Sequence, residues 1–286
     1  MPHSRRSSRR ADCSSRGAMT MPMTYRALAT DYDGTLAEDG VVSETTMDAL
    51  RRAKAAGITL VLVTGRELDE LLGVFPGIDV FDTVVAENGA LLYTPQPPPS
   101  PPITRLLATA PPPSFAETLA LRGVGPISRG RVIVATWEPH QVMVLQTIRD
   151  LGLELEVIFN KGAVMVLPSG VNKASGLRAA LLDFRLEASE VVGIGDAEND
   201  HSLLNACGLG VAVANAVPAL KQRADITMSK PRGQGVVELL ESMMTNGLAG
   251  IRRAPREIAA PSVPIVAAAG EGCVNQRSRM CANMSK

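Results

Sequence analysis

The sequence predicts an α/β fold, in which helices cover both faces of a mainly parallel sheet and a small α+β domain interrupts this layered core. Short apolar runs rich in β-branched residues alternate with helical periodicity along residues 25–94 and 171–247, as in parallel sheets. A proline-rich stretch at 94–102 marks a boundary, because proline is excluded from central strands and helix interiors. We therefore expect a core of residues 24–94 and 171–247, with an inserted domain of residues 95–170.

The first half of the predicted core contains a strand–helix–strand unit. Residues 25–31 and 58–65 are apolar runs that end in turn residues, as buried strands do. Residues 43–57 place apolar side chains on one helical face, with Ser43 as a cap at the start and Gly57 at the end. A helix between two strands allows the strands to pair in parallel.

A hairpin ends the first half and leads into the insert. Within the apolar run 82–94, the pair Asn88-Gly89 favours a tight turn between two strands. The insert is predicted to contain a strand at 131–137, a helix at 138–152 and two strands at 153–162 and 163–170. The second half of the core is predicted to contain a helix at 172–186, a strand, loop and helix within 190–208, strands at 208–216 and 224–230, and a last helix at 235–244.

The composition excludes several classes of protein. Of the 286 residues, 45% are hydrophobic and 3% aromatic, so an aliphatic core and a smaller second one can form. The formal net charge is zero, but residues 1–23 and 250–286 each carry a net charge of +4, which leaves −8 on the body. An acidic body argues against a nucleic-acid groove, which needs a basic stripe. No apolar run approaches the roughly 18 residues that span a membrane.

The two ends of the chain differ from the body. Residues 1–23 are rich in Arg and Ser and lack an apolar stretch, so we expect a disordered leader and not a secretory signal. A transit peptide, an RNA-binding arm or an early start codon are alternatives for this leader. Residues 248–286 mix Pro, Gly and Ala without periodicity and are also predicted to be mostly disordered. Three of the four cysteines lie in these ends without paired spacing, which favours a reducing, cytoplasmic compartment.

Polar side chains gather where the predicted core strands end. Asp31 and Asp33 follow the first strand, residues 64–66 follow the second, and residues 195–200 follow a strand of the second half. Open parallel sheets bind ligands at the carboxyl ends of their strands. Asp31 and Asp33 point the same way if the segment is extended, and they repel each other unless a cation or a shared proton offsets their charges. This pair therefore indicates a metal site or acid–base chemistry.

Four segments resemble the ordered motifs of the haloacid dehalogenase superfamily of phosphotransferases. They are DYDGT at 31–35, VTGR at 63–66, the lysine of VNKASGL at 171–177 and GDAENDHSLL at 195–204. With its AENGA hairpin and inserted domain, the chain is similar to subclass IIB, which includes Cof-like, archaeal-type phosphoglycolate and sucrose-phosphate phosphatases. The resemblance covers residues 25–245 and implies a Rossmann-like three-layer core with a small α+β cap domain.

The resemblance assigns a role to each of four aspartates in these motifs. Asp31 would be the nucleophile that forms an aspartyl-phosphate, and Asp33 would act first as general acid and then as general base. A Mg²⁺ ion would be bound by Asp31, the backbone carbonyl of Asp33, Asp196 and, directly or through water, Asp200.

The resemblance also implies a phosphate-binding set made of Thr64, Gly65, Lys173 and Asn199. The hydroxyl of Thr64 and the ammonium of Lys173 would bind the phosphoryl oxygens, and Asn199 would orient the residues around the metal. The sequence leaves open whether Arg66 or His140 contacts the substrate.

The implied activity is that of a Mg²⁺-dependent phosphatase for phosphoglycolate or a sugar phosphate, with the leaving group recognised by the cap. The expected partner is a small phosphorylated metabolite and not a nucleic acid or a membrane, and the expected assembly is a monomer or a homodimer. A phosphosugar mutase and a non-catalytic binding or regulatory protein are the alternatives. The mutase would need a second, arginine-rich phosphate site, for which the insert offers Arg105, Arg122, Arg129, Arg131 and Arg149.

Overall fold

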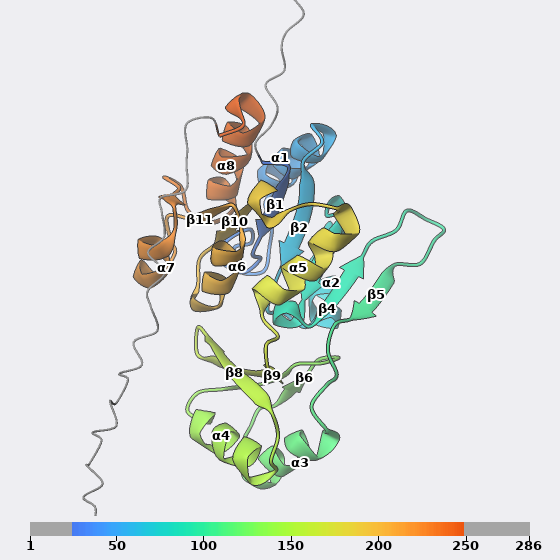
Figure 1. Ribbon diagram of the computed structural model, residues 1–286, viewed down its shortest axis with the longest axis vertical. Helices are drawn as coiled ribbons and strands as arrows, with labels where there is room; N and C mark the ends of the chain where they lie inside the picture. Colours follow the sequence, from blue (N-terminus) through green and yellow to red (C-terminus); the bar gives the residue numbers. More distant parts are fainter. Residues whose placement is uncertain (1–24, 249–286) are drawn as a thin grey trace, which may run out of the picture. The chain divides into compact units, whose positions relative to one another are not determined.

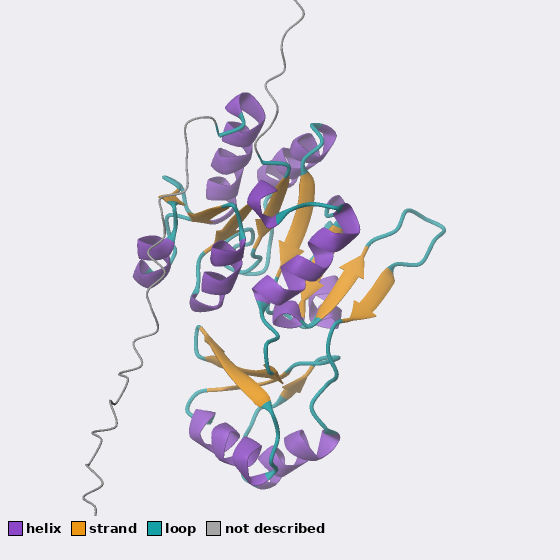
Figure 2. Ribbon diagram, viewed as in Figure 1, coloured by secondary structure: helices purple, strands orange, loops and turns teal. Residues whose placement is uncertain are grey.

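The computed structural model describes residues 25–248, which contain two β-sheets (Figures 1 and 2). The larger sheet has eight strands in the order β12-β11-β10-β1-β2-β3-β4-β5, with parallel pairing from β12 to β3 and antiparallel pairing at β4 and β5. Its strands are β1 Ala27–Thr30, β2 Thr59–Val63, β3 Thr83–Ala86, β4 Leu91–Thr94, β5 Ile103–Leu106, β10 Val191–Gly195, β11 Leu209–Ala212 and β12 Ile226–Thr227. This arrangement confirms the predicted α/β fold.

Helices cover both faces of the larger sheet. The chain passes from β1 through α1 to β2 on one side, and from β10 through α6 to β11 on the other side. Because such crossovers are right-handed, the two opposite directions place α1 and α6 on opposite faces. Helix α8 packs beside α1, and α5 packs beside α6. The helices of this layer structure are α1 Glu44–Ala55, α2 Leu68–Val74, α5 Lys173–Phe184, α6 His201–Ala206, α7 Pro218–Arg223 and α8 Arg232–Asn246.

The central strands form where the apolar runs predicted them. Every residue of β1 is buried, and β2 is buried from residue 60 to 63, as expected for strands covered on both faces. Ser43 caps α1 by accepting the N–H of Thr46, an interaction that typically contributes about 1 kcal/mol. The strand order reverses between β1 and β10, and such a switch point is where open α/β sheets bind ligands.

The smaller sheet has the order β6-β7-β9-β8, is antiparallel and carries two helices on one face. Its elements, which we call the cap, are α3 Pro113–Leu121, β6 Ser128–Arg129, β7 Val134–Trp137, α4 Gln141–Asp150, β8 Leu155–Asn160 and β9 Ala163–Pro168. Val164 and Val166 of β9 pack with Phe115 and Val144 of the helices. Met165 lies between them in sequence and belongs to a separate apolar cluster, because successive strand residues point to opposite faces.

The larger sheet extends into the segment that the sequence assigned to the insert. Strands β3 and β4 form the predicted hairpin around Asn88 and Gly89. The chain then returns as β5, which pairs with β4 along its length. The proline-rich residues 97–102 therefore connect two strands of one sheet, where proline needs no ladder partner. The expected insert 95–170 thus contains β5 of the larger sheet in addition to the cap.

A buried glutamate joins the cap to the larger sheet. Glu87, in the β3–β4 turn, is fully buried, and its carboxylate accepts the backbone N–H groups of Arg131, Val132 and Ile133 at 2.8, 2.7 and 3.0 Å. These three donors lie in the segment that leads into β7. Gly130 precedes them, and a Cβ atom there would lie 2.6 Å from the Glu87 Cδ atom. The attachment therefore depends on backbone groups and on the absence of a side chain at residue 130.

The expected leader, 1–23, and the expected tail, 248–286 apart from Leu248, lie outside the described residues. Within residues 25–248, none of the helices combines the length and the hydropathy that crossing a bilayer requires.

Candidate active site

The candidate site lies at the carboxyl ends of β1, β2 and β10. Asp31 directly follows β1, Thr64 directly follows β2, and Asp196 directly follows β10. Strands β2 and β10 both pair with β1 in parallel, so the three strand ends lie side by side at the switch point. The structure therefore brings together residues that are more than 130 positions apart in the sequence.

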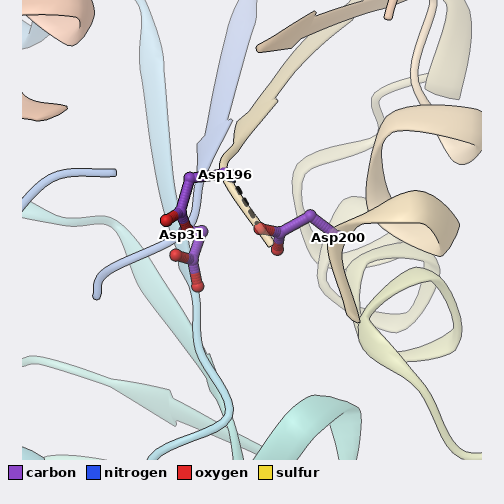
Figure 3. Close-up of side chains that lie close together, drawn as sticks. All are labelled: Asp31, Asp196 and Asp200. Carbon is purple, nitrogen blue, oxygen red and sulfur yellow. Dashed lines mark hydrogen bonds between the residues drawn. The ribbon is translucent and has the colours of Figure 1, made fainter. Parts of the chain in front are cut away.

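Three aspartates direct their carboxylates into one space (Figure 3). One oxygen each from Asp31, Asp196 and Asp200 can be chosen so that all three lie within 4.8 Å of one another, and all three residues are buried. An octahedral Mg²⁺ with ligands at about 2.0–2.1 Å separates its oxygen ligands by roughly 3–4 Å. The donor set and its spacing therefore fit a hard divalent cation.

Asp200 shapes the loop that carries Asp196. The Oδ2 atom of Asp200 accepts the backbone N–H groups of Asp196 and Ala197, both at 2.9 Å. The hydroxyl of Thr35 donates to Oδ1 of Asp196 at 3.3 Å. These contacts hold the two carboxylates in place against their mutual repulsion.

Lys173 is a buried ammonium between two of the acids. It is the first residue of α5, which begins where the Asn172 side chain caps the helix. Its Nζ atom donates to Oδ1 of Asp31 at 2.5 Å and to Oδ1 of Asp200 at 2.6 Å. Burial alone would lower the pKa of Lys173, but the two carboxylates outweigh burial and raise it. Lys173 therefore stays charged and offsets part of the negative charge of the site.

Asp31 has a much higher proton affinity than an ordinary aspartate. Burial and the charge of Asp200, against the opposing effect of Lys173, together raise the pKa of Asp31 to about 7. The Lys173 ammonium is therefore not enough to keep this carboxylate fully ionised at neutral pH. A second cation beside Asp31 would complete the charge balance.

Asp33 lies at the edge of the site and is paired with Arg66. The guanidinium of Arg66 donates from Nε to Oδ2 at 2.7 Å and from Nη2 to Oδ1 at 2.8 Å, a bidentate geometry. The same guanidinium donates to Glu70 at 2.5 Å and lies 5.5 Å from the centroid of the Tyr32 ring. The side chain of Asp33 is 38% exposed, so it can still meet a ligand.

The expected phosphate-binding residues surround the acids. Thr64 is buried, and its Oγ1 accepts the N–H of Arg66 at 3.1 Å. A Cβ atom on Gly65 would lie 3.5 Å from Nδ2 of Asn199, so the two residues are neighbours. The Asn199 amide donates to Asn88 at 3.2 Å, whereas its buried Oδ1 has no hydrogen-bond partner among the described residues. That oxygen is available to a ligand.

A cavity of about 620 Å³ lies between these residues and the cap. This volume is in the range of small-molecule binding sites. The core side of the cavity is lined by Asp31, Asp33, Gly65, Arg66, Glu67, Glu70 and Ala197. The cap side includes Ile133, Ala135, Trp137, Lys161, Ala163 and Met165.

Lys161 extends from the tip of the β8–β9 hairpin toward the acids. Its Nζ atom donates to the backbone carbonyl of Asp33 and to Oδ2 of Asp196, both at 2.9 Å. Gly34 allows this approach, because its φ is +84° and a Cβ atom there would lie 2.8 Å from the Lys161 Nζ. Burial lowers the pKa of Lys161, but the hydrogen bond and the charge of Asp196 outweigh burial and raise it. The cap thus places a positive charge directly beside the acidic cluster.

A sequence profile for the haloacid dehalogenase-like hydrolases matches residues 28–97 and 140–240 of this chain. The chain belongs to the haloacid dehalogenase-like hydrolases. A curated relative of this family, the phosphoglycolate phosphatase of Methanothermobacter thermautotrophicus, is 32% identical over 228 residues. The match covers 77% of this chain and 99% of the relative.

Solved structures share the fold of this haloacid dehalogenase-like hydrolase. A protein from Thermoplasma acidophilum superposes with a TM-score of 0.65 and 18% identity, over 76% of this chain and 97% of that one. A sugar phosphatase of subclass IIB superposes with a TM-score of 0.62 and 19% identity, over 76% of this chain and 98% of that one. At these identities the likeness concerns the fold.

Sequence reasoning missed two features of this hydrolase site. Arg66 was noted in the second motif, but its bidentate contact with Asp33 was not predicted. Lys161 was not singled out, because a lysine in a hairpin turn gives no signal of what the turn approaches. His140 precedes α4, its Nε2 atom bonds to the Gly125 carbonyl and it does not line the cavity, so the structure gives no support to a substrate contact by this residue.

Proposed function

We propose that this hydrolase is a Mg²⁺-dependent phosphatase that acts on a small phosphorylated metabolite, phosphoglycolate or a sugar phosphate, through an aspartyl-phosphate on Asp31. The main support is the buried cluster of Asp31, Asp196 and Asp200, with Lys173 in contact, which meets a cavity at Asp31. Phosphoryl transfer depends on positioning and on offsetting negative charge, which such a cluster provides with a bound cation. The names of the phosphoglycolate phosphatase relative and of the structurally similar sugar phosphatase point the same way.

The metal would be held by oxygen atoms that already lie close together. These are the carboxylates of Asp31, Asp196 and Asp200, with the backbone carbonyl of Asp33 as a further ligand. The Asp33 carbonyl lies near Asp196, since both accept from the same ammonium of Lys161. Bound Mg²⁺ would offset the charge that develops on the phosphoryl oxygens.

In the first step, an oxygen of Asp31 attacks the phosphorus atom, and the bond from phosphorus to the leaving oxygen breaks as the new bond forms. Protonated Asp33 gives its proton to the leaving oxygen. Lys173 and the Thr64 hydroxyl bind the other phosphoryl oxygens. The product alcohol then leaves the cavity while the phosphoryl group stays on Asp31.

In the second step, the ionised Asp33 takes a proton from water as that water attacks the phosphorus atom. The bond between phosphorus and Asp31 breaks, which restores the Asp31 carboxylate and releases inorganic phosphate. Arg66 contacts both oxygens of Asp33 and therefore fixes the orientation of the ionised carboxylate. One of these two contacts must be released when Asp33 carries the proton.

The proposed activity is tested by measuring phosphate release from a panel that contains phosphoglycolate and several sugar phosphates, ranked by kcat/KM. We expect turnover with Mg²⁺, loss of turnover after chelation with EDTA, and recovery when Mg²⁺ is added back. Ca²⁺ should be a poor activator, because it prefers more ligands in a looser geometry. Full activity after exhaustive chelation would contradict the metal requirement, and no turnover with any ester would contradict the phosphatase.

We further predict that Mg²⁺ binding weakens as the pH falls below 7. The metal binds the ionised carboxylate of Asp31, whose pKa burial raises to about 7, so protons compete with the metal. About nine-tenths of such a group is ionised at pH 8 and about one-tenth at pH 6, which predicts a roughly tenfold weaker apparent affinity at pH 6. Calorimetric titration of the protein with Mg²⁺ at both pH values measures this difference. The Asp31→Asn protein is the control and should lose most of the pH dependence; equal wild-type affinities at both pH values would contradict the prediction.

A phosphosugar mutase is supported less well. Among the described residues that line the cavity, the positively charged ones are Arg66 and Lys161, and Arg66 is paired with Asp33 and Glu70. Three insert arginines are paired elsewhere: Arg105 with Asp183, Arg122 with Asp150, and Arg131 with Asp69. The intact acidic cluster also gives no support to a non-catalytic protein. The cytoplasmic location and the monomeric or homodimeric state stay predictions from the sequence.

A further inference from the structure

The tip of the β8–β9 hairpin is the part of the cap that comes closest to the acids. Asn160 pairs with Ala163, so the turn between them consists of Lys161 and Gly162 alone. Both turn residues have positive φ, +49° for Lys161 and +84° for Gly162, as a type I′ turn requires. Asn, Asp and Gly are favoured at the first of these positions and a long side chain is uncommon there. Such an unfavourable choice is typical of residues retained for function.

Lys161 differs in charge from the other residues of the cap wall, by which we mean the cap residues that line the cavity. It is the only charged residue among the described cap residues that line the cavity. Two hydroxyl groups of this wall already donate, Ser128 to Glu67 and Thr136 to the Pro126 carbonyl, and the Oδ1 atom of Asn160 in the same wall has no hydrogen-bond partner among the described residues. A sugar has several hydroxyl groups, and each needs a partner when it is buried. The cap therefore offers one ammonium and one amide on an otherwise largely apolar surface. A polyol would find few partners there, whereas a short anionic group would find its countercharge in Lys161.

The present hydrogen-bond partners of Lys161 are expected to change when the metal binds. Its ammonium bonds to the Asp33 carbonyl and to Asp196, and both are proposed ligands of Mg²⁺. A doubly charged ion attracts these oxygens more strongly than an ammonium does and repels that ammonium. When the metal is bound, Lys161 therefore loses these two partners, and its ammonium becomes available to an anionic group of a ligand in the same cavity.

We propose that Lys161 is a specificity-determining residue that binds a carboxylate on the leaving group, so that the enzyme prefers phosphomonoesters of short hydroxy acids over neutral esters. This inference rests on the proposed phosphatase function and assigns the recognition of the leaving group to one side chain of the cap. The phosphate is bound on the core side of the cavity, and the carboxylate is bound on the cap side.

The test compares phosphoglycolate with its primary amide, in which the carboxylate is replaced by a neutral group of the same size. The measured quantity is the ratio of kcat/KM for the acid to that for the amide. We expect a high ratio for the wild type, a ratio about 10- to 100-fold lower for Lys161→Gln, and a largely retained ratio for Lys161→Arg. Arg149→Gln is the matched control, because it removes one positive charge from an exposed position of the cap outside the cavity and should keep the wild-type ratio.

Binding can be measured without turnover. Trp137 is the single tryptophan of the chain, is 53% exposed and lines the cavity, so its fluorescence reports on the bound ligand. In an Asp31→Asn background with Mg²⁺, Lys161→Gln should raise the dissociation constant of phosphoglycolate about 10- to 100-fold and change that of the amide much less. The melting temperature of each variant shows whether it is folded.

The outcomes separate this inference from the proposed function. A folded Lys161→Gln protein that keeps the wild-type ratio overturns the role of Lys161 but leaves the phosphatase standing. A wild type that hydrolyses the amide as well as the acid overturns the preference for a carboxylate. If no phosphomonoester is hydrolysed, the proposed function fails, and the fluorescence titration alone decides whether Lys161 binds the carboxylate.

Discussion

Turnover is expected to fall by a factor on the order of 10⁴ or more when Asp31 is replaced by asparagine, with every phosphate ester that the wild type hydrolyses. The amide cannot form the aspartyl-phosphate. The other carboxylates of the cluster cannot replace it, because Asp200 is held by two backbone N–H groups and by Lys173, and Asp196 by Thr35 and Lys161. Initial rates of phosphate release at saturating substrate measure this loss.

The Asp31→Asn protein should nevertheless be folded. Burial and the neighbouring acid raise the pKa of Asp31 to about 7, which means that the folded protein disfavours the ionised side chain relative to the unfolded chain. At pH 8, without metal, a neutral amide at this position should therefore leave the melting temperature unchanged or raise it. Appreciable turnover by the variant would contradict the assignment of the nucleophile. A large drop in melting temperature would contradict the prediction that the variant is folded, and the loss of turnover would then reflect unfolding.

Asparagine at position 33 should separate the two steps of the reaction. Asp33→Asn keeps the backbone carbonyl but loses the group that gives and takes the proton, an effect typically worth about 10²–10⁴-fold. With p-nitrophenyl phosphate the first step should survive, because the phenolate leaves without protonation. With an alkyl phosphate the first step should fail, because an alkoxide is a poor leaving group. The second step should slow with both substrates, because the attacking water has lost its base.

The expected consequence with p-nitrophenyl phosphate is a phosphorylated enzyme. Rapid quenching of the Asp33→Asn protein, followed by mass spectrometry, should show the added phosphate on the peptide that contains Asp31. A burst of p-nitrophenolate close to one equivalent per enzyme should accompany it. The matched alkyl phosphate serves as the control and should give neither signal. The covalent mechanism would be wrong if the phenyl ester were turned over slowly without phosphate ever appearing on Asp31.

Much of the core and its acidic cluster could be predicted, because the determinants are local. Apolar runs indicated β1, β2 and β10, and polar residues directly after a strand must lie at its end. Once parallel pairing was assumed, Asp31, Thr64 and Asp196 had to be neighbours. The predicted turn at Asn88 and Gly89 is confirmed by the β3–β4 pairing, since both residues readily adopt positive φ.

The contacts between the cap and the core could not be predicted in this way. The position of Lys161 beside Asp33 depends on how the whole hairpin is placed, and no periodicity within the hairpin records that placement. Strand β5 was missed because it is short and exposed and follows a run of prolines. Helix α3 was missed because it begins at Pro113, the last of three consecutive prolines, although proline is well suited to the first turn of a helix.

The attachment of the cap through Glu87 bears on how enzymes of this architecture can be re-engineered. The carboxylate contacts only main-chain N–H groups of residues 131–133, so the joint imposes no side-chain identity at these three positions and requires only the glycine at residue 130. A recombinant chimera that kept Glu87 and Gly130 could exchange the residues beyond this joint for those of a homologous enzyme without redesigning the catalytic half. In this sense the Glu87 joint could carry different caps, and the side-chain contacts of Ser128 and Arg131 with the core are the ones that each exchange would have to match.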